Sequence, residues 1–272
     1  MTRNTAARTA RIDDAARANS AAPGDSAALQ AFAAREDSTT PAAAPRELNL
    51  ALLPEIPFCA SSDILLSDPL RPAETPSEEF RTLRTRLEQM QATRTIQTVL
   101  IASPSAGEGK SFTAANLALA QAQLADNPTL LCDFDLRNPI LHRVFQIGRG
   151  PGISDYLLGK ANLHQVVRRI EDRNLFVLPA GEAASNPLEL LHLKEVRQLM
   201  DALRRVFRWI ILDSPPLLAA SDANLLAALA DGTLLVTRLG GTTIDAMGRA
   251  IESLGAPNVL GIVANCVGPG RL

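Results

Sequence analysis

Six short apolar runs follow one another from residue 98 onward, and helical stretches lie between most of them. The runs cover residues 98–103, 129–134, 174–180, 209–214, 233–239 and 259–267, and the helical stretches cover 111–125, 187–206, 221–230 and 243–255. The runs are apolar throughout, without polar alternation, which is typical of strands buried on both faces. Because strands that alternate with helices form parallel sheets, the sequence predicts an α/β fold: a doubly wound, mostly parallel sheet with helices on both faces.

A further helix is expected before the first apolar run. Thr75 can cap this helix, Pro76 suits its first turn, and Glu78 completes a capping box. The helix is predicted to extend to about Gln91. We therefore expect the folded domain to cover residues 75–270.

The residues before that helix have a different composition. Residues 1–45 contain sixteen alanines and a single aromatic residue. Such a segment has too few large apolar side chains to offset the entropy lost on folding. We expect a disordered tail at residues 1–47 and an extended linker at residues 48–74.

Charge and cysteine content exclude several classes of protein. A formal net charge of −2 argues against nucleic-acid binding, which needs a basic face. Cys59, Cys132 and Cys266 are far apart and odd in number, which fits neither a zinc site nor a disulfide framework and favours a reducing cytosol. The longest uncharged run, 253–270, is interrupted by prolines and glycines, so no membrane span is expected. No secretory signal is recognisable, and we expect a cytoplasmic protein.

The segment SAGEGKSF, residues 105–112, lies between a predicted strand and a predicted helix. Gly107 and Gly109 can bring backbone N–H groups close to an anion, and the helix start adds a partial positive charge. Lys110 would reach the β- and γ-phosphates of a nucleotide, and the Ser111 hydroxyl would ligate Mg²⁺. The sequence thus predicts a phosphate loop, although Pro104 stands where the general pattern has a glycine.

Carboxylates follow two of the predicted strands. Asp133 and Asp135 end one strand, with Arg137 close behind, and Asp213 ends another. Strand-end aspartates often cap turns. Beside a phosphate loop they can also serve phosphoryl transfer, because one carboxylate can bind Mg²⁺ through water while another accepts a hydroxyl proton.

Three segments resemble the Walker A, Walker A′ and Walker B motifs of the bacterial tyrosine kinases that act in capsule synthesis. They are SPSAGEGKS (103–111), LLCDFDLRNP (130–139) and IILDSPP (210–216). Glu78, Arg81 and Arg84 match the E-x-x-R-x-x-R motif of the same family. The resemblance runs from about residue 75 to 267, and the family's phosphate loop typically lacks the first glycine, as here.

The resemblance implies a Mg-ATP site with defined roles. Asp133 would be the catalytic base, and Ser111, Asp135 and Asp213 would lie on the metal side. The residues implied to contact the nucleotide are Gly107, Glu108, Gly109, Lys110, Ser111, Phe112, Arg238 and Asn265. Arg238 and Asn265 could equally be ordinary polar groups at strand ends.

The resemblance also implies partners. Family members work with a membrane-embedded polysaccharide co-polymerase, whose cytosolic tail activates the kinase and recruits it to the inner face of the plasma membrane. The helix that carries Glu78, Arg81 and Arg84 joins family subunits into a ring. A solvated charged helix face is the simpler interpretation of these three residues from their spacing alone.

The chain departs from the family in its tyrosines. Family kinases phosphorylate a cluster of tyrosines near the carboxyl terminus, whereas this sequence contains one tyrosine, Tyr156, in an amphipathic stretch. Self-phosphorylation of such a tail is therefore not expected. The protein could phosphorylate another protein, act as an ATP-gated scaffold, or be a MinD/ParA-type ATPase. The last class has an additional lysine where this chain has Ser105.

Overall fold

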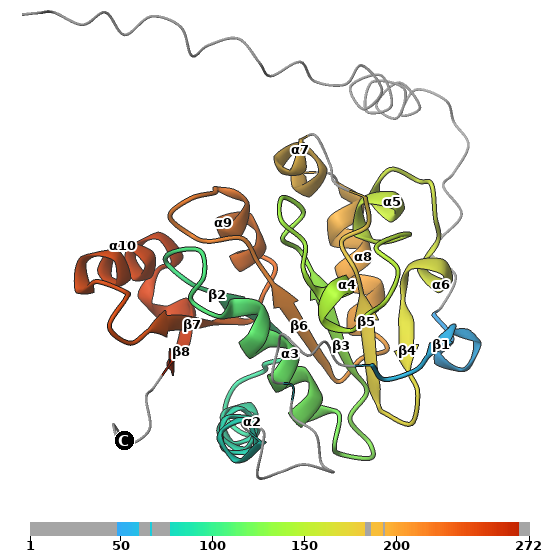
Figure 1. Cartoon of the computed structure of the whole chain (residues 1–272), viewed down its shortest axis with the longest axis horizontal. Coiled ribbons are helices and arrows are strands. Elements are labelled where there is room, and N and C mark those ends of the chain that lie inside the picture. Colours follow the sequence, from blue (N-terminus) through green and yellow to red (C-terminus); the bar gives the residue numbers. More distant parts are fainter. Residues whose placement is uncertain (1–47, 60–65, 67–76, 183–185, 193, 267–272) are drawn as a thin grey trace, which may run out of the picture.

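A computed structural model describes residues 48–59, 66, 77–182, 186–192 and 194–266. These residues form an eight-stranded sheet in the order β1-β4-β5-β3-β6-β2-β7-β8 (Figure 1). The strands are β1 (Glu55–Ile56), β2 (Thr98–Ala102), β3 (Thr129–Asp133), β4 (Arg168–Ile170), β5 (Leu175–Leu178), β6 (Trp209–Asp213), β7 (Gly232–Arg238) and β8 (Val259–Asn265). Every neighbouring pair is parallel except β4 and β5, which are antiparallel. The predicted mostly parallel sheet is confirmed.

Helices cover both faces of this sheet (Figure 1). They are α2 (Ser77–Gln91), α3 (Lys110–Gln121), α4 (Leu141–Val144), α5 (Ile153–Leu157), α6 (Leu163–Val166), α7 (Pro187–His192), α8 (Lys194–Arg204), α9 (Asp222–Ala227) and α10 (Ile244–Leu254). Along β2, Leu100 packs with residues of α8 and α9, whereas Val99 and Ile101 pack with residues of α2 and α3. Alternate side chains of a strand point to opposite faces, so the two faces have separate cores. None of the described helices is long and apolar enough to cross a lipid bilayer.

The six predicted strands are all present, and two strands were not predicted. The stretch 187–206 contains two helices, α7 and α8, where one was expected, and residue 193 between them lies outside the described residues. Strand β4 was missed because it has only three residues, two of which are arginines. Arg168 is nevertheless buried, since its guanidinium donates hydrogen bonds to the carbonyl oxygens of Gly148 (3.2 Å) and Gly150 (2.7 Å).

Residues 48–59, predicted as part of an extended linker, instead belong to the folded domain. Strand β1 pairs with β4 at the edge of the sheet, and Leu48 and Leu53 are buried in the core. No local pattern indicates this strand, because it has two residues and lies between Pro54 and Pro57. The tail predicted at 1–47 and the helix cap predicted at Thr75 lie outside the described residues.

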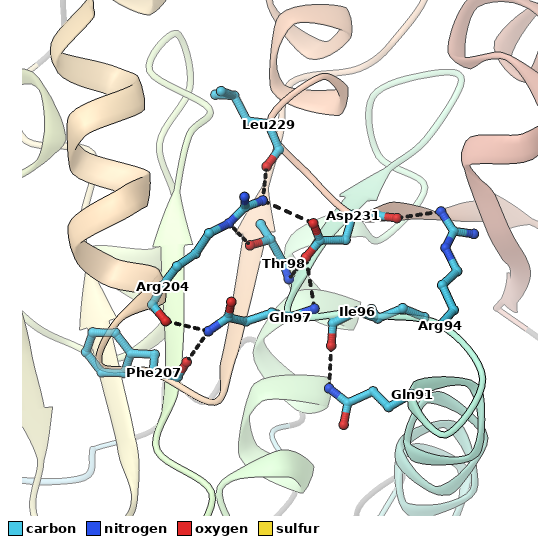
Figure 2. A network of polar contacts seen from close by, with 9 residues as sticks. All are labelled: Gln91, Arg94, Ile96, Gln97, Thr98, Arg204, Phe207, Leu229 and Asp231. Carbon is cyan, nitrogen blue, oxygen red and sulfur yellow. Dashed lines mark hydrogen bonds and ion pairs between the residues drawn. The ribbon is translucent and has the colours of Figure 1, made fainter.

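A network of hydrogen bonds joins segments at the amino-terminal edge of the sheet, where the parallel strands β2, β6 and β7 begin (Figure 2). The Asp231 carboxylate accepts hydrogen bonds from the N–H groups of Gln97 (2.9 Å) and Thr98 (2.7 Å) and pairs with Arg204 (3.2 Å). The Gln97 side chain in turn donates to the carbonyl oxygens of Arg204 (2.6 Å) and Phe207 (2.7 Å). These contacts fasten the end of α8 and the turn before β7 to the start of β2.

The opposite edge brings together the carboxyl ends of β3, β6, β2, β7 and β8, which are neighbours in the sheet. Asp213 on β6 lies in register with Asp133 on β3 and with Ile101 on β2, and Arg238 lies in register with Asn265. Open α/β sheets bind ligands outside the carboxyl ends of their strands. The fold therefore places most of the predicted site residues along one edge.

Candidate nucleotide-binding site

The phosphate loop connects the end of β2 to the start of α3. Gly107 has φ +76° and Gly109 has φ +96°, values in the left-handed region that favours glycine. A β-carbon on Gly109 would lie only 1.9 Å from Nδ2 of Asn265. The shape of the loop therefore requires both glycines predicted from the sequence, and the close contact with β8 is a second requirement for Gly109.

The first turn of α3 provides the positive end of the site. The N–H groups of Lys110, Ser111 and Phe112 have no carbonyl partner within the helix, because the first intrahelical bond runs from Thr113 N–H to the Gly109 carbonyl (2.9 Å). Gly109, at the cap position, has no side chain to cover them. Helix starts of this kind bind phosphate.

Lys110 is almost buried and lies near the acidic side chains at the ends of the neighbouring strands. Only 8% of Lys110 is exposed, and its charge acts on the Asp213 carboxylate. The predicted cation, Lys110, and the predicted acid, Asp213, thus lie near each other at the carboxyl-terminal edge of the sheet.

Two carboxylates, Asp133 and Asp213, are fully buried opposite the phosphate loop. The Oδ2 atom of Asp133 accepts hydrogen bonds from the N–H groups of Ile140 (3.0 Å) and Leu141 (2.9 Å). Among the described residues, no partner of ordinary hydrogen-bond geometry satisfies Asp133 Oδ1 or either oxygen of Asp213. Buried oxygens without partners are costly, and in native proteins they often mark a place where a ligand or ion binds.

Burial raises the pKa of Asp213 to about 7, and the Ser111 hydroxyl and the Lys110 charge offset part of this rise. Burial also raises the pKa of Asp133, and the neighbouring Asp213 charge adds to it. Two carboxylates that disfavour each other's ionisation are stabilised when a cation binds between or beside them. The donor set therefore fits a hard divalent cation such as Mg²⁺.

The described residues contain no group of three or more His, Cys, Asp and Glu side chains arranged as a metal site. Mg²⁺ does not require such a group, because proteins commonly bind it through one or two side chains together with nucleotide phosphates and water. The residues predicted to hold such an ion stay Ser111, Asp135 and Asp213.

Asp135 and Arg137 follow β3 and are more exposed than Asp133 and Asp213. Asp135 is partly exposed, and its carboxylate accepts a hydrogen bond from the N–H of Asn138 (3.0 Å). Arg137 forms a two-pronged ion pair with the buried Asp222 at the start of α9 (2.7 and 3.2 Å). Arg137 thus fixes the loop after β3 against α9, a role that the sequence did not reveal.

Three other predicted nucleotide contacts occupy positions beside the phosphate loop. Arg238 is exposed at the end of β7, and the Asn265 side chain at the end of β8 donates to the Glu108 carbonyl oxygen (3.0 Å). The ring of Phe112 packs edge-on against Phe80 of α2, 5.8 Å between centroids, which places this ring between α2 and α3. The roles of these residues toward a nucleotide stay predictions.

The helix α2 carries the three residues predicted to join subunits. Glu78 forms an ion pair with Arg81, and both side chains are partly or largely exposed. Arg84 donates to the Ala120 carbonyl oxygen of α3 (2.8 Å) and is therefore engaged within its own chain. Arg81 likewise donates to Gln123 Oε1 of its own chain (3.4 Å), so Glu78 is the most accessible of the three residues.

Sequence reasoning missed Thr242, which lies in the loop between β7 and α10. Its hydroxyl donates a hydrogen bond of 2.6 Å to the Glu108 carboxylate in the phosphate loop. Thr242 and Thr243 are adjacent and identical in type, and no local pattern distinguishes the one that reaches the site. Only the placement of β7 next to β2 does so.

Known proteins are similar to this chain in sequence and in fold. Residues 99–272 match the family model of the CobQ/CobB/MinD/ParA nucleotide binding domain. The chain is 37% identical over 196 residues to the tyrosine-protein kinase YwqD of Bacillus subtilis, covering 71% of this chain and 82% of YwqD. It is 33% identical over 206 residues to the tyrosine-protein kinase CpsD of Streptococcus agalactiae, covering 75% of this chain and 89% of CpsD. The chain belongs to the bacterial tyrosine kinases.

Solved structures of bacterial tyrosine kinases agree with this family. The kinase domain of the Escherichia coli tyrosine kinase ETK matches 80% of this chain and 91% of its own, with a TM-score of 0.70 and 28% identity. The septum site-determining protein MinD from Pyrococcus horikoshii, with a TM-score of 0.51 and 20% identity, shares the fold alone. Some bacterial tyrosine kinases are much longer: the chain is 36% identical to the putative tyrosine-protein kinase EpsB of Ralstonia solanacearum but spans only 26% of its length.

Proposed function

We propose that this protein is a Mg-ATP-dependent protein-tyrosine kinase that regulates the polymerisation and export of a capsular polysaccharide or exopolysaccharide. Family membership and one structural observation support the proposal. Asp133 and Asp213 are buried with unsatisfied oxygens beside Lys110 and the start of α3. A cationic cradle that faces unsatisfied carboxylates suits a magnesium-bound triphosphate.

The residues of this site would divide the work of phosphoryl transfer. The amides of the phosphate loop and the Lys110 ammonium bind and orient the phosphates and oppose the charge that builds up during transfer. Ser111, Asp135 and Asp213 would hold Mg²⁺. When bound, the ion neutralises phosphate charge and aligns the transferred group.

Asp133 would act on the acceptor. Its Oδ2 atom is fixed by two backbone N–H groups, and its Oδ1 atom has no partner among the described residues. Burial and the Asp213 charge raise the pKa of Asp133, which makes its carboxylate a better proton acceptor. Asp133 would thus take the hydroxyl proton of a tyrosine as its oxygen attacks the γ-phosphate.

The acceptor tyrosine would belong to another protein. Tyr156 is the single tyrosine of the sequence, and on α5 it is half-buried against the core. Burial raises the pKa of Tyr156, which further disfavours it as an acceptor.

The partner would be a membrane polysaccharide co-polymerase. Its cytosolic tail would activate the kinase and recruit it to the inner face of the plasma membrane. Subunits would assemble into a ring through α2.

The test is transfer of labelled phosphate from γ-labelled ATP and Mg²⁺ to a random Glu–Tyr copolymer. The purified protein is assayed with and without the cytosolic tail of the co-polymerase. We expect phosphotyrosine on the copolymer and none on Tyr156, and we expect Asp133→Asn to bind ATP without transferring the label. ATP binding without transfer under every condition would refute the kinase and favour an ATP-gated scaffold.

A further inference from the structure

The loop between β7 and α10, residues 239–243, reaches the phosphate loop and fixes the side chain of Glu108. The Thr242 hydroxyl donates to Oε1 of Glu108 (2.6 Å), and the Ser105 N–H donates to Oε2 (2.9 Å). Only 5% of Glu108 is exposed. Each oxygen of this buried carboxylate therefore has one donor, and the two donors come from different segments of the chain.

The Thr242 hydroxyl is itself held in one direction. Its Oγ1 atom accepts a hydrogen bond from the Arg238 N–H (2.8 Å), and the Arg238 carbonyl oxygen accepts from the N–H groups of Gly241 (3.0 Å) and Thr242 (2.9 Å). Gly240, with φ +75°, allows this tight turn. Because a carboxylate can only accept, the hydroxyl proton must point to Glu108.

The position of the Glu108 charge matters for an anionic ligand. Glu108 lies between Gly107 and Gly109, and its neighbour Lys110 is the cation of the loop. A carboxylate that turned into the cradle would repel phosphate oxygens and compete with them for Lys110. In the structure, the charge is instead compensated by the Ser105 N–H within the phosphate loop and by the Thr242 hydroxyl from the β7–α10 loop.

We propose that Thr242 is a positioning residue for nucleotide binding: its hydroxyl keeps Glu108 turned away from the phosphates and so holds the phosphate loop open to an anion. This inference rests on the proposed function, because it requires that the loop receive the phosphates of a nucleotide. It makes Thr242, on the β7–α10 loop, part of the machinery that sets nucleotide affinity.

The test compares two neighbouring threonines by calorimetric titration with Mg-ADP. Thr242→Val keeps the shape of the side chain and removes the hydroxyl, and we expect affinity to fall about tenfold. Thr242→Ser should restore most of the affinity. The matched control is Thr243→Val, because the Thr243 hydroxyl oxygen accepts from the Ala246 N–H (3.1 Å) and only caps α10. This control should lower thermal stability and leave affinity unchanged.

A double variant shows whether Thr242 acts through Glu108. In a Glu108→Ala background, Thr242→Val should have no further effect on affinity. The inference is overturned if Thr242→Val binds Mg-ADP as tightly as the wild type, or if Thr242→Val and Thr243→Val weaken binding equally. A wild-type protein that binds no Mg-ADP would overturn the proposed function as well, so the two failures are distinguishable.

Discussion

The two edges of the sheet differ in how far the oxygens of their acidic side chains are satisfied. At the amino-terminal edge, the Asp231 carboxylate has donors on both oxygens, from Gln97, Thr98 and Arg204 (Figure 2). At the carboxyl-terminal edge, Asp213 is fully buried and neither of its oxygens has a partner of ordinary geometry among the described residues. A satisfied carboxylate stabilises the fold, whereas an unsatisfied one costs free energy. The difference separates the edge that holds the protein together from the edge prepared for a ligand.

The largest effect is expected from the cation at the carboxyl-terminal edge. Lys110→Met removes the buried ammonium group that faces the phosphates, and we expect affinity for Mg-ADP to fall by at least about a hundredfold. The variant should still fold, because this change removes none of the contacts at the amino-terminal edge. Titration calorimetry and a thermal unfolding curve measure the two quantities. An unchanged affinity would contradict the assignment of the cradle.

The next effect concerns the amino-terminal edge. Asp231→Ala leaves the N–H groups of Gln97 and Thr98 without their acceptor and removes the partner of Arg204, so the free energy of unfolding should fall by about 3 kcal/mol. Affinity for Mg-ADP should not change in the folded protein. Urea unfolding measures the loss. The control is Asp245→Ala, which removes an exposed pair with Arg249 on α10 and should cost less than about 0.5 kcal/mol.

A smaller effect of opposite sign is expected at Asp213. Its pKa of about 7 in the folded protein lies above the ordinary value of 3.8, so the folded state binds more protons than the unfolded state between these pH values. The free energy of unfolding of the metal-free protein should therefore fall as pH rises from about 4 to 7. Asp213→Asn should flatten this dependence and add about 1 kcal/mol at pH 7.

Urea unfolding at several pH values, without and with Mg²⁺ and ADP, tests this expectation. The Asp213→Asn protein should gain stability alone and lose the extra stability that Mg²⁺ gives in the presence of ADP. A variant less stable than the wild type at pH 7 would show that the Asp213 carboxylate is already satisfied, and the contrast between the two edges would not hold.

Most of the fold and much of the site could be predicted from local sequence. The apolar runs identified the six longest strands, and the glycines around Glu108 identified the phosphate loop, because each depends on neighbours in the sequence. Strands β1 and β4 are too short to show periodicity. The contacts of Thr242 and Arg137 join segments 134 and 85 residues apart. Only the strand order brings such residues together, and no spacing rule encodes it.

The hydrogen bond from Asn265 to Glu108 has a consequence for the protein during its synthesis. It spans 157 positions of the chain, and contacts of such separation form late in folding. In a nascent chain that does not yet include β8, the Asn265 side chain is missing from its place beside Gly109. We expect nascent and prematurely halted chains to be unable to retain nucleotide, so that ATP capture begins only when the last strand has joined the sheet.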